Sequence, residues 1–297
     1  MIISASRRTD IPAFYAEWFV RRVREGYCEV QNPMNPKQVT KVSLLPEDVD
    51  VVVFWTRSPR SMLSRLSELD GRGLRYYFQF TLCDYGAPID GKNPSVATAV
   101  DAFKRLTSHT GADRVIWRYD PIVFSKATGV DFHLRNFEAI ADSLKGFTKR
   151  CVVSIWDNYR KLARRLETLD SHGIHFRQPQ REELDRLIPR LAQICAANGM
   201  EIVSCAEKVD LVSYGVKRGK CVDDDLIRRI FEIEVCPRKD GAQRPACGCV
   251  QSRDIGVYNS CLFGCMYCYA TTCFRTAAAN HRRHDPDSPT LMPLVLQ

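Results

Sequence analysis

The sequence predicts an α/β fold in which parallel strands form an incomplete (β/α)6 barrel. Six short runs of apolar, β-branched and aromatic residues recur along the chain. Within each run the apolar residues are nearly continuous, which is typical of parallel strands buried on both faces. Most are followed by a segment with helical spacing, and strands that alternate with helices indicate βαβ units. The predicted strands span residues 2–6, 51–55, 76–81, 114–119, 151–156 and 202–205. An open doubly wound sheet is the alternative that this pattern leaves.

Three segments between the strands carry apolar residues along one helical face. Residues 96–106 predict the first of these helices, with Ser95 as its N-cap. The other two helices are predicted over residues 131–144 and 182–195. Residues 28–32 and 39–44 flank the turn-forming segment NPMNPK and predict a β-hairpin.

The chain divides by composition into three parts. Residues 1–235 predict the partial barrel, and residues 236–281 a cysteine-rich, cluster-binding segment packed on the barrel mouth. Within that segment, residues 236–252 are rich in Pro, Gly, Arg and Cys and have no periodicity. We therefore expect a loop that owes its order to something other than an apolar core. Residues 282–297 are expected to form a flexible tail.

The composition is that of a soluble enzyme. Hydrophobic residues make up 45% of the 297 residues and charged residues 26%. No apolar run approaches the roughly 18 residues that a membrane span needs, so we expect no membrane partner. The N-terminus lacks the order of a signal peptide, and we expect a cytoplasmic protein. The net charge of +8 permits a nucleic-acid partner without requiring one.

The number of cysteines is unusual for a cytoplasmic protein. The chain has 13 of them, and disulfides seldom persist in that compartment. Clustered thiols there indicate metal or redox chemistry.

Polar residues end each predicted strand. In β/α barrels the reactive groups lie at the carboxyl ends of the strands, where the loops converge. Cations and carboxylates gathered there suit a zwitterionic or phosphorylated ligand, because the arginine fork matches carboxylate and phosphate groups. The catalytic candidates at this mouth are Arg8, Asp10, Arg118, Asp120 and Glu207.

A C-x3-C-x2-C motif lies near the end of the chain. In the segment YNSCLFGCMYCYA it supplies Cys261, Cys265 and Cys268. Three thiolates in a short loop can hold one face of a [4Fe–4S] cluster, which usually takes four cysteine ligands. The motif therefore predicts a cluster with one iron open to another ligand.

The motif resembles that of radical S-adenosylmethionine (SAM) enzymes, in which an aromatic residue such as Tyr267 precedes the last cysteine. The resemblance implies a barrel of the radical SAM type, with SAM bound through its amino and carboxylate groups at the open iron. It also implies formation of a 5′-deoxyadenosyl radical, with an electron donor such as a ferredoxin or flavodoxin. We expect Tyr267, Ser6 and Arg57 to lie beside this cofactor.

The position of the motif differs from that in radical SAM enzymes, where it follows the first strand. Four segments together resemble an uncharacterised bacterial and archaeal family, a domain of unknown function with C-terminal cysteines like the radical SAM motif. These segments are SASRRTDIP, VFWTRSP, WRYDPI and CGCVQSRDIGVYNSCLFGCMYCYA. No glycine-rich SAM motif is present, so SAM is inferred from the cysteine motif alone.

A second group of cysteines lies outside this motif. Cys205 ends a predicted strand, Cys221 precedes the capped helix start VDDDL, and Cys247 and Cys249 form a C-G-C turn. We predict that these four hold a second iron–sulfur cluster, with Cys236 in reserve, because a metal would order the aperiodic loop.

Other interpretations remain open at this point. One alternative is a zinc site formed by Cys265 and Cys268 together with Cys247 and Cys249. Another is a structural or electron-transferring cluster in which Cys273 or another cysteine is the fourth ligand beside Cys261, Cys265 and Cys268. The main hypothesis is a radical SAM-type enzyme acting on an unidentified small-molecule or nucleic-acid substrate. The alternative is a non-catalytic iron–sulfur or zinc protein that contacts nucleic acid.

Overall fold

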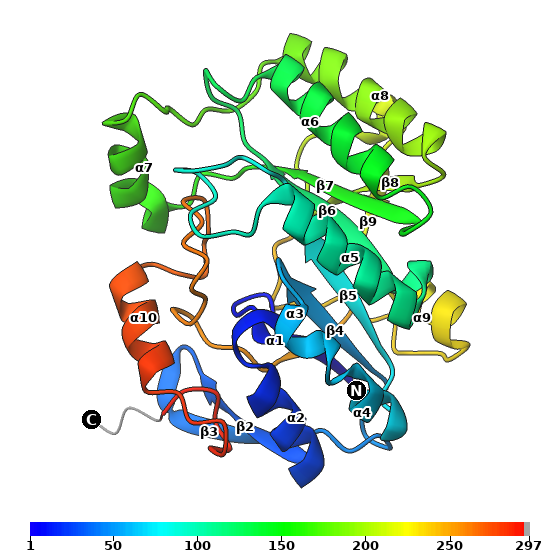
Figure 1. Cartoon of the computed structure of the whole chain (residues 1–297), viewed down its shortest axis with the longest axis vertical. Coiled ribbons are helices and arrows are strands. Elements are labelled where there is room, and N and C mark those ends of the chain that lie inside the picture. Colours follow the sequence, from blue (N-terminus) through cyan, green and yellow to red (C-terminus); the bar gives the residue numbers. More distant parts are fainter. Residues whose placement is uncertain (294–297) are drawn as a thin grey trace.

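The computed structural model describes residues 1–293, apart from the side chain of Pro36, as an α/β fold around one parallel sheet. Eight strands pair in the order β10-β1-β4-β5-β6-β7-β8-β9, and every pairing is parallel. The sheet is consistent with a partial barrel, with β10 and β9 as its edges. Figure 1 labels β4 to β9 of this sheet. Its strands are β1 (Ile2–Ala5), β4 (Val51–Thr56), β5 (Tyr76–Thr81), β6 (Val115–Ile122), β7 (Arg150–Ile155), β8 (Glu201–Cys205), β9 (Lys217–Gly219) and β10 (Arg253–Asp254).

The six predicted strands coincide with β1 and β4 to β8. The edge strands β9 and β10 were not predicted, because three and two residues are too few to show a periodicity. β10 begins directly after the segment 236–252, which the sequence predicts as a loop. The parallel sheet therefore has two more strands than the pattern of apolar runs reveals.

The helices follow the strands as expected. The three predicted helices are α5 (Val96–Thr110), α6 (Val130–Ser143) and α8 (Arg181–Ala197), and Ser95 caps α5 by accepting a hydrogen bond from the Thr98 N–H. Figure 1 shows these three helices along the same side of the sheet. The remaining helices are α1 (Ile11–Phe14), α2 (Ala16–Glu25), α3 (Arg60–Leu63), α4 (Leu66–Gly71), α7 (Ala163–Asp170), α9 (Asp224–Phe231) and α10 (Phe274–Arg282), with 3-10 turns at Ala112–Arg114, Arg160–Leu162 and Val212–Tyr214. No helix in the described range is long and apolar enough to cross a membrane.

The predicted hairpin is formed by β2 (Tyr27–Asn32) and β3 (Asn35–Ser43), and the C-terminal residues pack beside it. The Glu29 N–H donates to the Pro289 carbonyl (2.8 Å), and the Trp18 indole donates to the Ser288 carbonyl (2.9 Å). Leu291 is 1% exposed. The expected flexible tail therefore packs on α2 and the hairpin, while residues 294–297 lie outside the described residues.

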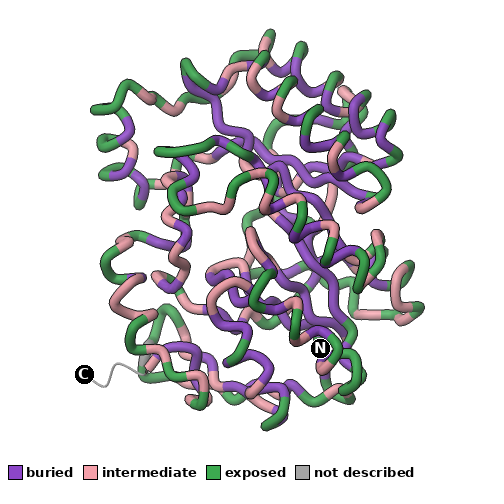
Figure 2. The backbone as a smooth tube through the Cα atoms, viewed as in Figure 1, coloured by how far each residue is buried: buried purple, intermediate pink, exposed green. Residues whose placement is uncertain are grey.

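The sheet separates two apolar cores. The outer core contains alternate strand residues such as Phe54 and Phe78 and packs under the helices. On the inner face, Val53, Tyr77 and Val203 pack with residues of α9 and of the cysteine-rich segment. Figure 2 shows buried backbone following the strands, with exposed positions on the outer surfaces of the helices.

Residues 236–252 cross the inner face from one edge of the sheet to the other. The segment has no helix, but Lys239 forms a bridge with Val250, and Val250 lies in the inner core with Cys247 and Cys249. It leads directly into β10, which pairs with β1. The cysteine-rich segment is thus continuous with the sheet, because it supplies one of the strands.

Phe78 provides a test of the outer core. Its side chain is 0% exposed and stacks on Phe54 at a ring-centroid distance of 4.8 Å. We expect Phe78→Ala to lower the free energy of unfolding by about 3–5 kcal/mol, because a large cavity remains beneath the helices. Urea unfolding measures this loss. Met34→Ala is the control, since Met34 is 90% exposed. A loss below about 1 kcal/mol for Phe78→Ala contradicts the assigned packing.

Candidate functional site

A cavity of about 480 Å3 opens at the carboxyl ends of the strands. It lies where the inner face changes from apolar to polar: β6 presents Ile116, then Arg118, then Asp120, and β8 presents Val203, then Cys205. Of the predicted site residues, all seven cysteines line the cavity, together with Ser6, Arg8, Asp10, Arg57, Arg118, Asp120 and Tyr267. Glu207 does not line it.

The loop that carries Cys261, Cys265 and Cys268 rests on the loop that follows β5. The Lys92 N–H donates to the Phe263 carbonyl (2.6 Å), and the Met266 N–H donates to the Ile89 carbonyl (2.9 Å). The two backbones approach so closely that a Cβ atom on Gly91 would lie 2.4 Å from the Phe263 oxygen. Glycine at this position therefore allows the cysteine loop to reach the cavity.

Two cations and one amide hold this cysteine loop. Arg165 donates to the carbonyls of Cys265 (3.0 Å) and Cys268 (2.5 Å), and the Asn93 amide donates to the Cys265 sulfur (3.4 Å). Beneath the loop, Arg57 donates to the Tyr267 hydroxyl. That hydroxyl in turn donates to Asp90 (2.5 Å).

Burial changes the acidity of these thiols. It raises the pKa of Cys265 to about 11 and holds the pKa of Cys261 well above its ordinary value. The charge of Asp10 and then the neighbouring thiols add to the rise for Cys261. Without a bound cation both thiols keep their protons at neutral pH. Metal binding at this loop must therefore release protons.

The structure also brings together Cys205, Cys221, Cys247 and Cys249. The sulfurs of Cys205 and Cys221 lie 3.1 Å apart, and Cys249 accepts from the backbone N–H of Cys221 at 3.2 Å. Cys249 lies beside Cys247, whose pKa is raised mainly by this contact. The pKa of Cys249 is lowered by hydrogen bonds from the neighbouring thiols and by the charge of Arg7.

Asp254, which the sequence did not single out, organises the mouth. It accepts hydrogen bonds from the hydroxyls of Ser4 (2.8 Å) and Ser6 (2.6 Å) and from the backbone N–H of Arg7 (3.0 Å). It also pairs with Arg8 at 2.9 Å. Burial alone raises the pKa of this carboxyl, but Arg8 and the hydrogen bonds hold it below the usual value. No local signal identifies Asp254, because its strand contains two residues.

The predicted carboxylates are held by local contacts. Asp10 caps α1 by accepting from the Ala13 N–H, and it also accepts from the Arg57 N–H (2.7 Å). Burial raises its pKa to about 7. Asp120 accepts from Arg118 and Ser154. Glu207 accepts from the Ile155 N–H (2.8 Å), outside the cavity.

Two buried donors on the cavity wall have no hydrogen-bond partner within the described residues. They are Nη2 of Arg7 and Nε1 of Trp156. The Arg7 guanidinium lies over the ring of Trp55, 4.9 Å from its centroid. Buried polar groups are normally satisfied, so these two shielded nitrogens are exceptions on residues that line the cavity.

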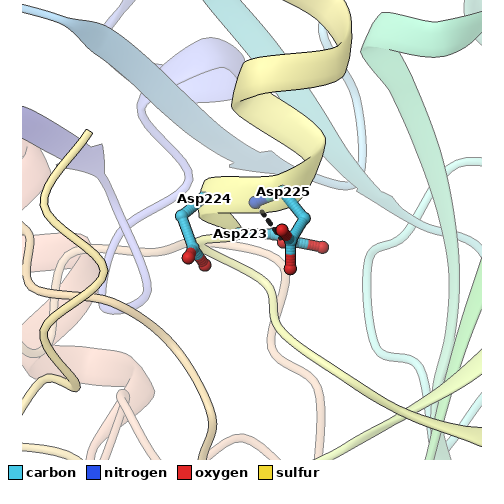
Figure 3. A group of neighbouring side chains, drawn as sticks. All are labelled: Asp223, Asp224 and Asp225. Carbon is cyan, nitrogen blue, oxygen red and sulfur yellow. Dashed lines mark hydrogen bonds between the residues drawn. The ribbon is translucent and has the colours of Figure 1, made fainter. Parts of the chain in front are cut away.

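Asp223, Asp224 and Asp225 form the acidic group drawn in Figure 3, whose carboxylate oxygens lie within 4.8 Å of one another. Asp223 caps α9 and pairs with Arg150 (2.6 Å). Asp224 pairs with Lys220 (2.6 Å). The group is thus explained by a helix start and its neighbouring cations.

Comparison with known proteins identifies the family. Residues 2–270 match the model of a domain of unknown function, DUF1848. The chain belongs to this family. No curated protein matches the chain. Among solved structures, a "putative alpha-L-fucosidase" from Bacteroides thetaiotaomicron is similar at 13% identity and a TM-score of 0.27, covering 57% of this chain and 66%, just under two thirds, of that one. Likeness at that level carries no argument about function.

Asp254 offers a pH-dependent test in this DUF1848 chain. Because its pKa is lowered on folding, its contribution to stability is present above the unfolded pKa of about 3.9 and is lost as the pH falls further. We expect Asp254→Asn to lower the free energy of unfolding by about 3 kcal/mol at pH 7, since it leaves the largely buried Arg8, whose side chain is 13% exposed, without its charged partner. The difference in the free energy of unfolding between Asp254→Asn and the unsubstituted chain should become smaller below pH 4.

Urea unfolding at several pH values measures this effect. Asp287→Asn is the control, because the Asp287 side chain is 73% exposed in its pair with Arg21 and should contribute less than about 1 kcal/mol. If the loss of unfolding free energy in Asp254→Asn stays constant from pH 7 to pH 3, Asp254 does not stabilise the fold through its negative charge.

Proposed function

We propose that this protein is an iron–sulfur enzyme of the radical SAM type. In this proposal Cys261, Cys265 and Cys268 hold a [4Fe–4S] cluster, and the substrate occupies the adjoining cavity. The observation that carries the proposal is the set of three cysteines on the cavity wall. Cys273, the next cysteine along the chain, starts α10 and does not line the cavity. A cluster held by these three thiolates keeps one iron free.

The residues present fit such a group. The donor set consists of soft thiolates, which iron–sulfur clusters require. Among the described cysteines, no three sulfurs lie within 4.8 Å of one another. This spacing fits a cluster of several irons better than a single tetrahedral metal ion. The Asn93 amide is placed to donate to the sulfur of Cys265 (3.4 Å).

When bound, a cluster of this kind with SAM at its free iron supplies a one-electron cleavage that yields the 5′-deoxyadenosyl radical. The electron comes from a donor such as a ferredoxin or flavodoxin. Such chemistry belongs to the cofactor, and the protein supplies binding, orientation and exclusion of water.

Ser6, Arg57 and Tyr267 act in this proposal as positioning residues. The Tyr267 hydroxyl is engaged by Arg57 and Asp90, and the Ser6 hydroxyl by Asp254. These groups hold the cysteine loop and the end of β1 in place. Both terminal nitrogens of Arg57 and the hydroxyls of Ser6 and Tyr267 are engaged within the protein, so recognition of a ligand falls mainly to other groups.

Arg7 and Trp156 take the ligand-binding role, because both side chains line the cavity. The Arg7 guanidinium presents a planar fork suited to a carboxylate or phosphate, and its stacking on Trp55 keeps that plane fixed. Aromatic rings also line the cavity and exclude water from a reactive species. These rings belong to Trp55, Trp156, Tyr159, Tyr258, Phe263, Tyr267 and Tyr269.

The nucleic-acid alternative receives less support. Stacking of single-stranded bases needs exposed aromatic rings beside cations. Tyr76, Tyr77 and Trp117, which adjoin Arg75 and Arg118 in sequence, are each 1% exposed or less. They pack in the cores and offer no platform for a base.

Anaerobic reconstitution with iron and sulfide tests the proposed function. We expect the spectrum of the reduced cluster to change on addition of SAM, and 5′-deoxyadenosine to form with a reductant. Cys265→Ala should lose about four irons per chain and all 5′-deoxyadenosine formation, because it removes a ligand. Cys273→Ala is the matched control and should keep both.

Two results would contradict the proposal. One is full iron content in Cys265→Ala. The other is a reduced cluster whose spectrum does not change when SAM is added, together with no formation of 5′-deoxyadenosine. Loss of the cluster in Cys273→Ala would instead indicate a four-cysteine cluster without an open iron.

A further inference from the structure

Four cysteines outside the first loop meet at the open side of the sheet. Cys205 ends β8, Cys221 follows β9, and Cys247 and Cys249 precede β10. They therefore come from three separate segments, next to the two edge strands. All four line the cavity.

The sheet itself positions Cys221. The Tyr77 hydroxyl and the Gln79 amide, both buried on β5, donate to the Cys221 carbonyl at 2.6 and 2.9 Å. Arg118 on β6 donates to the Cys221 sulfur at 2.8 Å. Buried side chains from two central strands thus place this thiol, and Cys205 lies 3.1 Å from it.

The turn that carries the other two cysteines is pressed against the end of β9. The Cys249 sulfur accepts from the backbone N–H groups of Cys221 (3.2 Å) and Val222 (3.4 Å). A Cβ atom on Gly248 would lie 3.4 Å from the Lys220 side chain, an ordinary van der Waals distance, so the turn packs directly beside the segment after β9. The N–H groups and the Arg118 guanidinium all donate to sulfur, as in iron–sulfur sites, where such bonds stabilise the negative charge.

The spacing of the sulfurs distinguishes between two kinds of metal site. Four thiolates around one zinc ion at about 2.3 Å lie roughly 3.8 Å from one another. Within the described part of the chain, no three cysteine sulfurs approach one another within 4.8 Å. Cys205 and Cys221 are in direct contact at 3.1 Å, while all four thiols line the same cavity, so the four sulfurs are not arranged as a single tetrahedral zinc site.

We propose that Cys205, Cys221, Cys247 and Cys249 hold a second iron–sulfur cluster, separate from the one at Cys261, Cys265 and Cys268. This cluster fastens residues 236–252 across the open side of the partial barrel. Its existence goes beyond the radical chemistry and does not depend on it.

Iron content and protease sensitivity test this proposal in the full chain. After reconstitution we expect about eight irons per chain, and about half of that in Cys249→Ala and in Cys265→Ala. Cys249→Ala should also be cleaved by protease between residues 236 and 252, because the metal no longer holds that segment. Cys236→Ala is the matched control, since Cys236 is an exposed thiol of the same segment, and it should keep all the iron.

The two proposals fail in different ways. If Cys265→Ala keeps half the iron but the unsubstituted chain does not respond to SAM, the second cluster stands and the radical SAM function falls. If the unsubstituted chain binds four irons or fewer, or if Cys265→Ala binds none, the second cluster does not exist, whether or not Cys249→Ala folds. Zinc in place of iron at these four cysteines also overturns the proposal.

Discussion

The carboxylate of Asp254 ties the end of the chain to its beginning. It accepts from Ser4, Ser6 and Arg7 of the first strand and its following turn, and it pairs with Arg8. Through this contact β10 joins the sheet beside β1. Because β10 lies between the C-G-C turn and the C-x3-C-x2-C loop, this junction places the cysteines of both that turn and that loop at the cavity.

The inner face of the sheet changes its character along the strands. Near the amino ends, residues such as Val53, Ile116 and Val152 form a dry core with α9. Near the carboxyl ends, the same face presents polar groups such as Arg118 and Ser154 to the cavity. The apolar half of this face stabilises the sheet by burial, so the residues of the polar half can line the cavity.

Charge within the cavity is largely balanced. Arg118 pairs with Asp120, Arg244 with Asp157, and Arg57 with Asp90. Such pairing limits the cost of burying the guanidinium groups. Arg7 differs from these cations, because one of its terminal nitrogens remains unpaired on the wall.

By itself the sequence determined the six central strands, the three long helices, the hairpin and the C-x3-C-x2-C motif. Each of these depends on residues within one short segment, where periodicity or spacing carries the information. Only the tertiary structure decided which distant residues meet. It brought Cys205, Cys221, Cys247 and Cys249 together, made Asp254 the partner of the first strand, and left Glu207 outside the cavity. It also packed residues 283–292 on α2 and the hairpin. These outcomes depend on the pairing of each edge strand with its neighbour and on contacts between separate segments, some of them more than 200 residues apart, which no local pattern records.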